Sequence, residues 1–331
     1  MAGLAAAARA RELGAQPLVL EKGDRPGGSM LLSSCVIWRY HSLEAFQEEC
    51  PAGDPALQGV IVNRLDESID WLESLGAPVV EHETGNPLTT GKRFDPRGLT
   101  EALALGVRLG EPVGEVGGPL VLATGGFPAR LARERGLMLR ANRWSEGDGL
   151  DLGLARGGQI AGDLDEFYGR AMPAVEGIPE EDFVFLSQLY GKYATVTAHD
   201  MSERFDRTPS WSETDLVQEI ARWPNGLAWY TVEEGNLKAR VRDRTVAEMI
   251  ERARAAGAIV ERDDGRVAVL VWAGVTQTLG GLKIDERAHV VGADELYAAG
   301  ADVGGISGGG YSSGLAAALV FGRIAAEEAL S

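Results

Sequence analysis

The stretch that decides the fold is ELYAAGADVGGISGGGYSSGLAAALVFGRIAAEEAL, residues 295–330. Its first six residues predict a strand that runs into a glycine turn, and the Gly- and Ser-rich part up to Gly314 supplies a flexible backbone. The rest is rich in Ala and Leu and predicts a long helix whose N-terminus points back at the turn. Free N–H groups at a helix N-terminus stabilise anions and electron-rich carbonyl groups. This stretch therefore predicts a strand–turn–helix unit that approaches a ligand.

The first 28 residues, MAGLAAAARARELGAQPLVLEKGDRPGG, carry part of a second unit of this kind. Residues 4–14 predict a helix that ends at Gly14, and PLVLE (17–21) predicts a short strand that ends in an acid, Glu21. In a dinucleotide-binding βαβ unit, a strand leads into G-x-G-x-x-G, and an acid about 20 residues further on binds the ribose. Gly3 stands where the third glycine belongs, whereas the first strand and the first two glycines are absent from the sequence.

The absent strand would be the central strand of a parallel sheet, buried on both faces. Without it, the neighbouring strands lack hydrogen-bond partners. We therefore expect the sequence to be a piece of a longer chain, or ordered segments joined without others. Residues 101–121 are also short for the strands that such a fold places there, and we expect residues to be missing from this segment too. The alternative is that residues 1–14 form an ordinary Ala-rich surface helix.

Composition bounds the protein class. With 331 residues, 45% of them hydrophobic, the chain can bury a large core and is expected to form two domains. A net charge of −17 argues against nucleic acid or an anionic membrane as a partner. The only cysteines, Cys35 and Cys50, indicate a reducing compartment, and the four histidines show no metal-ligand spacing. Since the sequence has no 18-residue apolar run and no signal peptide, it predicts a cytoplasmic protein.

The middle of the chain changes character twice. Residues 56–76 and 243–257 predict helices, while GGPLVLATGGF (117–127) and VAVLVWAGVTQTLGGLKI (267–284) predict strands that lead into glycine turns. From about residue 128 to 235, short helices are mixed with loops such as QLYGKYATVTAHD.

The predicted fold is α/β. Residues 1–127 and 236–331 are expected to form one discontinuous Rossmann-like domain. Residues 128–235 are expected to form a second domain that is inserted into the first.

Several of these segments, in this order, resemble the FAD-binding flavoproteins of the fumarate reductase/succinate dehydrogenase family, including its ketosteroid dehydrogenase and tricarballylate dehydrogenase relatives. The segments are GLAAAARARELGA with LVLEKGDRPGGS, VLATGGF (121–127), SEGDG (145–149), SERF (202–205), QTLGGLKID (277–285) and the closing stretch. The resemblance covers nearly the whole chain. It implies that the inserted domain, residues 128–235, is an α+β cap that would carry the substrate side of the site.

The resemblance implies FAD as a non-covalently bound cofactor. By it, the contacting residues are Ala2 and Gly3 at the pyrophosphate, Glu21 at the adenosine ribose, Lys22, Gly28 and Ser29 between diphosphate and flavin, Ala123, Thr124 and Gly125 beside the adenine, Asp148 in the GDG turn, and Gly300, Gly314 and Leu315 around the isoalloxazine. A covalent flavin–histidine link is not expected, because the only histidine nearby, His41, lacks the local motif and is expected at the surface.

The family reaction moves a hydride between the flavin and one carbon of a C–C bond that a carbonyl or carboxylate activates, and a proton to or from the next carbon. Such chemistry needs a placed acid or base and donors for the developing enolate. In SERF, Arg204 takes the position of the family's active-site arginine and is the predicted proton donor. The alternative is an arginine that pairs with Glu203 or Asp206.

The sequence departs from the family pattern at three positions. Gln277 stands where dicarboxylate enzymes carry a histidine, and the closing turn offers Tyr311 where they carry an arginine. A phenol donates to a carbonyl oxygen but does not neutralise a carboxylate, so a ketone-bearing or larger apolar substrate is expected instead of fumarate. Ala301 replaces a glutamate that bonds the FAD ribityl chain, and Asp302 is a candidate to substitute for it.

In the predicted mechanism, Arg204 transfers the proton to or from the substrate. Tyr311 and the amides near Thr278 and Gly280 hold the polarised oxygen of the substrate, and Gln277 is a further predicted substrate-binding residue. Tyr311 packing only against the flavin is the alternative. The expected partners are a small-molecule substrate and an electron donor or acceptor. A rival function is a family member with weak or lost FAD binding that acts as a non-catalytic binding protein.

Overall fold

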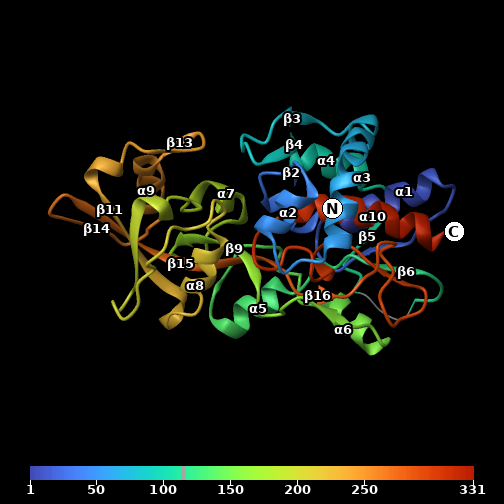
Figure 1. The fold of residues 1–331 in the computed structure, drawn as a ribbon. Coiled ribbons are helices and arrows are strands. Elements are labelled where there is room, and N and C mark those ends of the chain that lie inside the picture. Colours follow the sequence, from blue (N-terminus) through green and yellow to red (C-terminus); the bar gives the residue numbers. More distant parts are fainter. Residues whose placement is uncertain (113–115) are drawn as a thin grey trace. The chain divides into compact units, whose positions relative to one another are not determined.

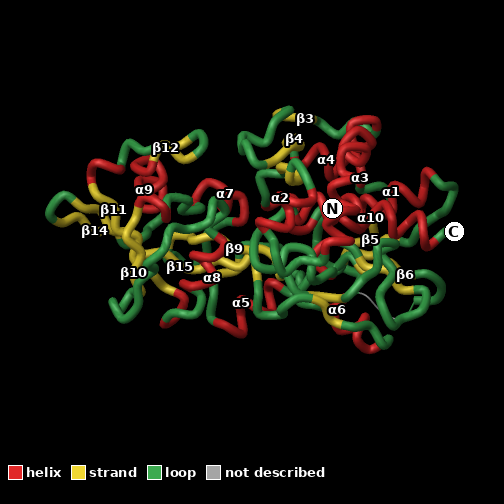
Figure 2. The backbone as a smooth tube through the Cα atoms, viewed as in Figure 1, coloured by secondary structure: helices red, strands yellow, loops and turns green. Residues whose placement is uncertain are grey.

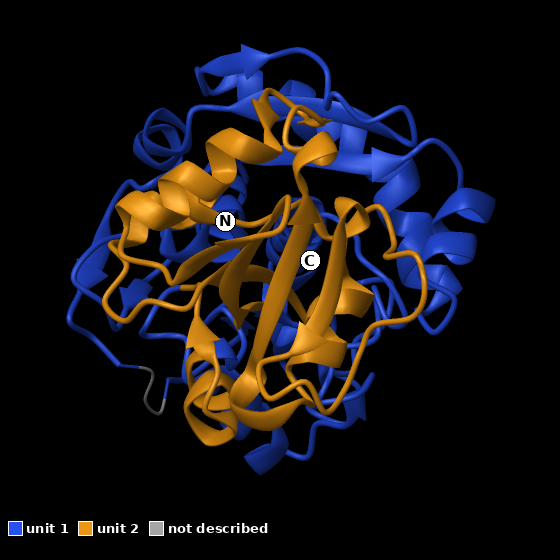
Figure 3. Cartoon of the chain, turned by 90° about the vertical axis from the view of Figure 1, so that its left-hand side faces the viewer, with its two compact units in different colours: residues 1–128, 142–166, 277–331 blue, residues 129–141, 167–276 orange. Residues whose placement is uncertain are grey.

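A computed structural model describes residues 1–112 and 116–331 as a mixed α/β fold (Figures 1 and 2). The chain divides into two compact units (Figure 3). Unit 1 comprises Met1–Pro128, Asn142–Glu166 and Gln277–Ser331, and unit 2 comprises Ala129–Ala141 and Phe167–Thr276. No helix in the described part of the chain has both the length and the apolar character needed to cross a membrane.

Unit 1 contains two parallel strand pairs. Strand β1 (Val19–Glu21) pairs with β5 (Val107–Leu109), and β6 (Leu120–Leu122) pairs with β17 (Leu296–Ala298). Within residues 1–112 and 116–331 no further strand joins these two pairs. Both β5 and the start of β6 fall in the segment 101–121, of which residues 113–115 lie outside the described residues.

Helices α1 (Ala2–Glu12) and α10 (Gly314–Ala329) pack against each other through small residues. A Cβ on Gly322 would lie 2.6 Å from the carbonyl oxygen of Ala2, so the two backbones approach closely. Six residues of α1 are buried, and the helix is therefore not an ordinary surface helix. As predicted, the chain leaves α1 through Gly14, which has a φ of +88°.

Charged groups tie α1 and α10 to the long helix α3 (Pro55–Ser74). Arg9 Nε donates to Glu327 across the α1–α10 contact at 2.9 Å, and Trp71 Nε1 donates to Glu12 at 2.8 Å. On α10, Arg323 donates to Ser68 Oγ at 2.7 Å while its guanidinium lies over the Trp71 ring. These contacts fix the three helices as one layer of unit 1.

An antiparallel sheet of order β2–β4–β3 completes the main elements of unit 1. Its strands are β2 (Val36–Tyr40), β4 (Thr89–Phe94) and β3 (Val79–Glu81). The other elements of this unit are η1 (Gly28–Leu32), α2 (Leu43–Glu49), α4 (Pro96–Leu103), α6 (Asp148–Ala155), β8 (Ile160–Ala161), β16 (Gly281–Leu282) and η6 (Gly300–Asp302). Cys35 and Cys50, at the start of β2 and the end of α2, are free and buried, and burial raises the pKa of each thiol to about 12.

Unit 2 is built on one sheet around β15 (Arg266–Thr278), whose neighbours are β11 (Leu227–Glu233) and β14 (Val260–Asp263). Strand β10 (Ala194–Ala198) pairs with β11, while β7 (Met138–Leu139) and β9 (Phe167–Pro173) pair with β15. The remaining elements are α5 (Pro128–Arg135), η2 (Glu180–Asp182), α7 (Phe183–Leu186), η3 (Gly191–Tyr193), α8 (Thr214–Ile220), η4 (Pro224–Gly226), η5 (Glu234–Asn236), β12 (Arg240–Val241), β13 (Arg244–Thr245) and α9 (Val246–Ala255).

The boundaries of the two compact units differ from the domain boundaries expected from the sequence. Residues 236–276 belong to unit 2, because β15 runs antiparallel to β11 from Leu227↔Trp272 to Glu233↔Arg266. Residues 142–166 return to unit 1, where β8 pairs with β16. The first expected boundary, at 127/128, lies one residue before the end of the first segment of unit 1, whereas the second, at 235/236, lies within unit 2.

Glu213 is a buried acid inside unit 2, directly before α8. Burial raises the pKa of its carboxyl group to about 7, although Arg170 and the backbone N–H groups of Gly191 and Lys192 favour the ionised form. The folded unit therefore favours the protonated carboxyl group more than the unfolded chain does.

Replacing Glu213 with Gln should remove one pH dependence of folding. The stabilisation tied to the protonated carboxyl group is present below its ordinary pKa of 4.5 and is lost as the pH rises through about 7. The free energy of unfolding of the wild type relative to Glu213→Gln should fall by about 2–3 kcal/mol between about pH 5 and about pH 8. Urea unfolding of both proteins across this range measures the difference. The exposed Glu234→Gln is the control and should run parallel to the wild type.

Candidate cofactor site

The buried carboxylate of Asp302 joins two of the predicted cofactor segments of unit 1. Its Oδ1 accepts hydrogen bonds from Thr124 Oγ1 at 2.7 Å and from Gly126 N at 3.3 Å. Its Oδ2 accepts from Thr124 N and from Gly125 N, the latter at 3.3 Å. Burial raises the pKa of Asp302, and these four hydrogen bonds oppose that rise.

The bonds of Asp302 correct one expectation. Each carboxylate oxygen already accepts two hydrogen bonds, so Asp302 has no oxygen to spare as a substitute for the glutamate missing at position 301. The N–H groups of Thr124 and Gly125 are equally committed. Contacts of this turn with a ligand must use carbonyl groups or van der Waals surface.

The second glycine turn, at 145–149, packs directly against this carboxylate. Gly149 N donates to Thr124 Oγ1 at 3.1 Å. A Cβ on Gly149 would lie 2.6 Å from Thr124 Oγ1 and 2.7 Å from Asp302 Oδ1, so only glycine fits. Gly126 is similarly close to the Thr278 hydroxyl, at 2.5 Å from a Cβ built on it. The turns at 124–126 and 145–149 and the segments at 278 and 302 therefore form one block.

The opening segment contacts this block through charged and polar groups. Lys22 Nζ forms an ion pair with Asp148 at the first position of α6. Glu21 Oε1 accepts a hydrogen bond from Gly23 N at 2.7 Å. Ser29 Oγ accepts from Asn142 N at 2.9 Å, and Gly28 lies beside the Asn142 side chain.

Small residues let the first and last helices meet near the glycine turns. A Cβ on Gly300, whose φ is +72°, would lie 3.1 Å from the Cβ of Ala2. A Cβ on Gly3 would lie 3.3 Å from the Cβ of Ala123. The structure therefore brings Ala2 close to Gly300 and Gly3 close to Ala123, and their role in cofactor binding stays a prediction.

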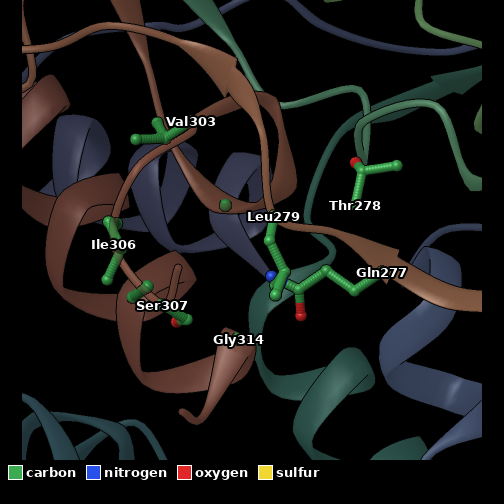
Figure 4. Close-up of a pocket in the computed structure, with 9 residues that line it drawn as sticks. Gln277, Thr278, Leu279, Val303, Ile306, Ser307 and Gly314 are labelled. Carbon is green, nitrogen blue, oxygen red and sulfur yellow. The ribbon is translucent and has the colours of Figure 1, made fainter. Parts of the chain in front are cut away.

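A pocket opens beside the first turn of α10 (Figure 4). Its lining residues are Gln277, Thr278, Leu279, Gly300, Val303, Ile306, Ser307, Gly314 and Ala317, none of which is charged. Gly314 is the first residue of α10, and a Cβ there would lie 1.9 Å from Gln277 Oε1. Leu315, the next residue of the helix, is partly buried.

Two predicted substrate residues, Thr278 in the pocket lining and Gly280 two residues further along the chain, have structural contacts of their own. Thr278 is buried, and its hydroxyl oxygen accepts a hydrogen bond from Phe127 N at 3.5 Å. A Cβ on Gly280 would lie 2.4 Å from the carbonyl oxygen of Asp163, so the backbone there is tightly packed.

Tyr311 is held on the loop that precedes α10. Its carbonyl oxygen accepts a hydrogen bond from Tyr40 Oη at 2.6 Å. Its ring meets the edge of Trp38 with 5.5 Å between the ring centroids. Two aromatic residues of β2 therefore hold Tyr311: Tyr40 bonds to its backbone and Trp38 packs against its partly buried ring. The sequence analysis singles out neither of them. The aromatic run VIWRY at 36–40 is the signal that could have indicated them.

Arg204 lies in unit 2, whereas all the predicted cofactor residues lie in unit 1. Its guanidinium forms an ion pair with Asp206 at 3.1 Å, and 62% of the side-chain surface is exposed. This ion pair is the one that the alternative interpretation of SERF expects. The catalytic role of Arg204 stays a prediction. His41 is exposed, as expected, and contacts the carbonyl oxygen of Pro87.

The described residues contain no group of three His, Cys, Asp or Glu side chains placed to hold a metal ion. Asp302 is the residue of the site whose importance the sequence analysis underrated. Asp302 is the only acidic residue between Glu295 and Glu327 in the sequence. An isolated acid in such an apolar, Gly-rich stretch indicates a buried carboxylate that needs hydrogen-bond donors.

Comparison with known proteins identifies related folds. The family model described as FAD binding domain matches residues 116–315, and the model described as NAD(P)-binding Rossmann-like domain matches residues 1–33.

Solved structures are similar over essentially the whole chain. The open conformation of a flavocytochrome c3 fumarate reductase shares 19% identity over 100% of this chain and 77% of its own, with a TM-score of 0.72. A 3-ketosteroid-Δ4-(5α)-dehydrogenase from Rhodococcus jostii RHA1 shares 16% identity over 100% of this chain and 95% of its own, with a TM-score of 0.70. A 3-ketosteroid Δ1-dehydrogenase from Sterolibacterium denitrificans shares 13% over 99% and 97%, with a TM-score of 0.69. At these identities the similarity concerns the fold.

Replacing Asp302 with Asn should loosen the block of glycine turns. An amide offers one acceptor oxygen and places an NH₂ group against backbone N–H donors, so buried donors lose their partner. The free energy of unfolding should fall by about 3 kcal/mol. Urea or thermal unfolding measures this loss. The matched control is Asp294→Asn, which makes the same change at an exposed position of unit 1 and should leave stability unchanged within about 0.5 kcal/mol. An equally small effect of Asp302→Asn would contradict the role given to this carboxylate.

Proposed function

The chain belongs to the FAD binding domain family, and on that premise we propose that it is an FAD-dependent oxidoreductase acting on CH–CH groups. The reaction would be dehydrogenation of a C–C bond next to a carbonyl or carboxylate, or reduction of the corresponding alkene. The observation that carries the proposal is the convergence in unit 1 of the opening helix, both glycine turns and the start of α10.

The residues present fit an FAD molecule. Ala2, Gly3 and Gly300 bring backbone close together without side chains in the way, which suits the approach of a pyrophosphate to the N-terminus of α1. Glu21, at the end of β1, keeps one carboxylate oxygen that is not bonded to Gly23 and would bind the adenosine ribose. Gly314 and Leu315 begin α10, whose N-terminal N–H groups favour an electron-rich carbonyl. When bound, FAD would supply hydride acceptance or donation.

Uncharged groups on the chain favour a ketone over a dicarboxylate as the activating group. The nine described residues that line the pocket beside α10 carry no charge. Gln277, which is one of them, and Tyr311, on the loop before α10, are both neutral hydrogen-bonding groups. A charged substrate would lose its hydration without gaining a counter-ion there. The Tyr311 phenol would donate to the ketone oxygen, together with amides near Thr278 and Gly280, and stabilise the charge that develops on it.

Proton transfer is assigned to Arg204. The position of this arginine in SERF supports the assignment, and its ion pair with Asp206 supports the competing structural interpretation. Activity of the variants below separates the two.

The first experiment is the visible absorbance spectrum of the purified protein, before and after addition of FAD. The proposal expects flavin bands that stay with the protein through gel filtration. Enones, ketosteroids and unsaturated acids should then be screened for bleaching or reoxidation of the bound flavin. A protein that takes up no flavin, even from excess FAD, would instead support the rival function of a non-catalytic binding protein.

Once a ketone substrate is found, Tyr311→Phe and Arg204→Ala test the roles of these side chains. Loss of a hydrogen-bond donor to the developing oxyanion should lower kcat about 10²–10³-fold. Loss of the general acid should lower it about 10²–10⁴-fold. In both variants the spectrum of the bound flavin should stay unchanged. Tyr297→Phe and the exposed Arg222→Ala are matched controls that should keep full turnover. Full turnover by Arg204→Ala would leave only the ion pair with Asp206 as its role.

A further inference from the structure

The interior of unit 2 holds a cluster of polar groups that the proposed function does not use. Tyr190 and Tyr230 have no exposed surface, and Glu213 is 6% exposed. Within the described residues, Tyr190 Oη, Tyr230 Oη and Glu213 Oε2 are buried and have no hydrogen-bond partner.

These three groups come from separate segments and meet in one place. The Tyr190 and Tyr230 rings meet edge to face, with 5.5 Å between their centroids. Glu213 Oε1 accepts a hydrogen bond at 2.8 Å from the N–H of Gly191, the residue that follows Tyr190. Glu213 is also near enough to both phenols to contribute to the rise in their pKa values, which burial dominates. The cluster therefore connects the segment before η3, the start of α8 and strand β11.

Neighbouring charges are already engaged elsewhere. The positive charge of Arg170 opposes the rise in the pKa of both Glu213 and Tyr230. Its guanidinium donates to the carbonyl oxygen of Ser212 and lies over the Tyr168 ring. Asp215, the other charged group that acts on Glu213, accepts hydrogen bonds from Ser210. None of these contacts involves Tyr190 Oη, Tyr230 Oη or Glu213 Oε2.

Buried polar atoms in folded proteins almost always have a partner, either protein or ordered water. Three free atoms within one cluster therefore indicate a guest molecule. Burial keeps the two phenols uncharged at neutral pH and the carboxyl group largely uncharged below neutral pH, which favours a neutral guest. Each phenol can donate or accept, and a carboxyl oxygen accepts or, when protonated, donates. A water molecule, with two donors and two acceptors, matches this set.

We propose that Tyr190, Tyr230 and Glu213 form an internal hydration site in which ordered water bridges the two phenol hydroxyls and Glu213 Oε2. The backbone agrees with a site that is held together locally. Glu213 has a φ of +54°, a left-handed conformation that is uncommon for residues other than glycine. Such strain persists where surrounding contacts fix the residue, and the bond from Gly191 and the bridging water are such contacts. The inference does not rest on the proposed oxidoreductase function.

The direction in which a Tyr→Phe substitution changes stability tests the proposal. If water satisfies the hydroxyls, Tyr190→Phe and Tyr230→Phe should each lower the urea midpoint of unfolding. The double variant should lose less than the sum of the two, because the first substitution already weakens the binding of the shared water. If the hydroxyls have no partner, removing them relieves a burial penalty, and the midpoint should stay or rise. That result would overturn the proposal. Tyr193→Phe, at a partly exposed position in the same segment, is the control.

A crystal structure of the wild-type protein at a resolution that shows ordered water provides a second test, which does not depend on variants that fold. The proposal expects a water peak within hydrogen-bond distance of at least two of the three atoms. A cluster in which all three atoms bond directly to protein groups, or in which the space between them is dry, would refute it.

Discussion

The arrangement of unit 1 depends on one buried carboxylate, that of Asp302. A carboxylate taken out of water needs hydrogen-bond donors, and the turn at 124–126 supplies four of them. Close packing around this carboxylate also explains two nearby glycines. A Cβ on Gly149 would collide with Thr124 Oγ1 and with Asp302 itself, and a Cβ on Gly126 would collide with Thr278 Oγ1 and the carbonyl oxygen of Ala301. The glycine clusters of this chain therefore serve two purposes. Some shape the surface that we propose binds FAD, while others allow the segments behind that surface to pack closely.

Unit 2 is stabilised in a different way. Its long strand β15 pairs with four other strands, so the unit is organised by main-chain hydrogen bonds more than by close contact of small residues. Large aromatic residues fill its interior, and the phenols at 190 and 230 bring polar atoms with them. A polar interior restricts how the surrounding segments can repack, because each alternative arrangement must also satisfy those atoms.

How far the sequence predicts this structure depends on the range of the interactions. Helices α1 and α10 and the strand–turn at 120–126 follow from local composition and glycine placement, and they lie where expected. The bond between Thr124 and Asp302 joins residues 178 positions apart, and no local pattern encodes it. Unit 2 extends beyond the expected domain boundary at 235/236 for the same reason, since the sequence of 267–276 predicts a strand but not its partner β11. Arg204 illustrates a third limit: the sequence offered both a catalytic role and an ion pair with Asp206, and only coordinates show that the pair forms.

The two cysteines give this chain a built-in reporter. Both thiols lie in unit 1, have at most 1% exposed surface and carry a pKa raised by burial, so almost no reactive thiolate meets solvent in the folded state. Alkylation of Cys35 or Cys50 must therefore wait until the region of β2 and α2 opens. Because unit 2 contains no cysteine, the rate of labelling follows the opening of unit 1 alone. A thiol reagent thus separates the local stability of one unit from that of the other without any engineered probe.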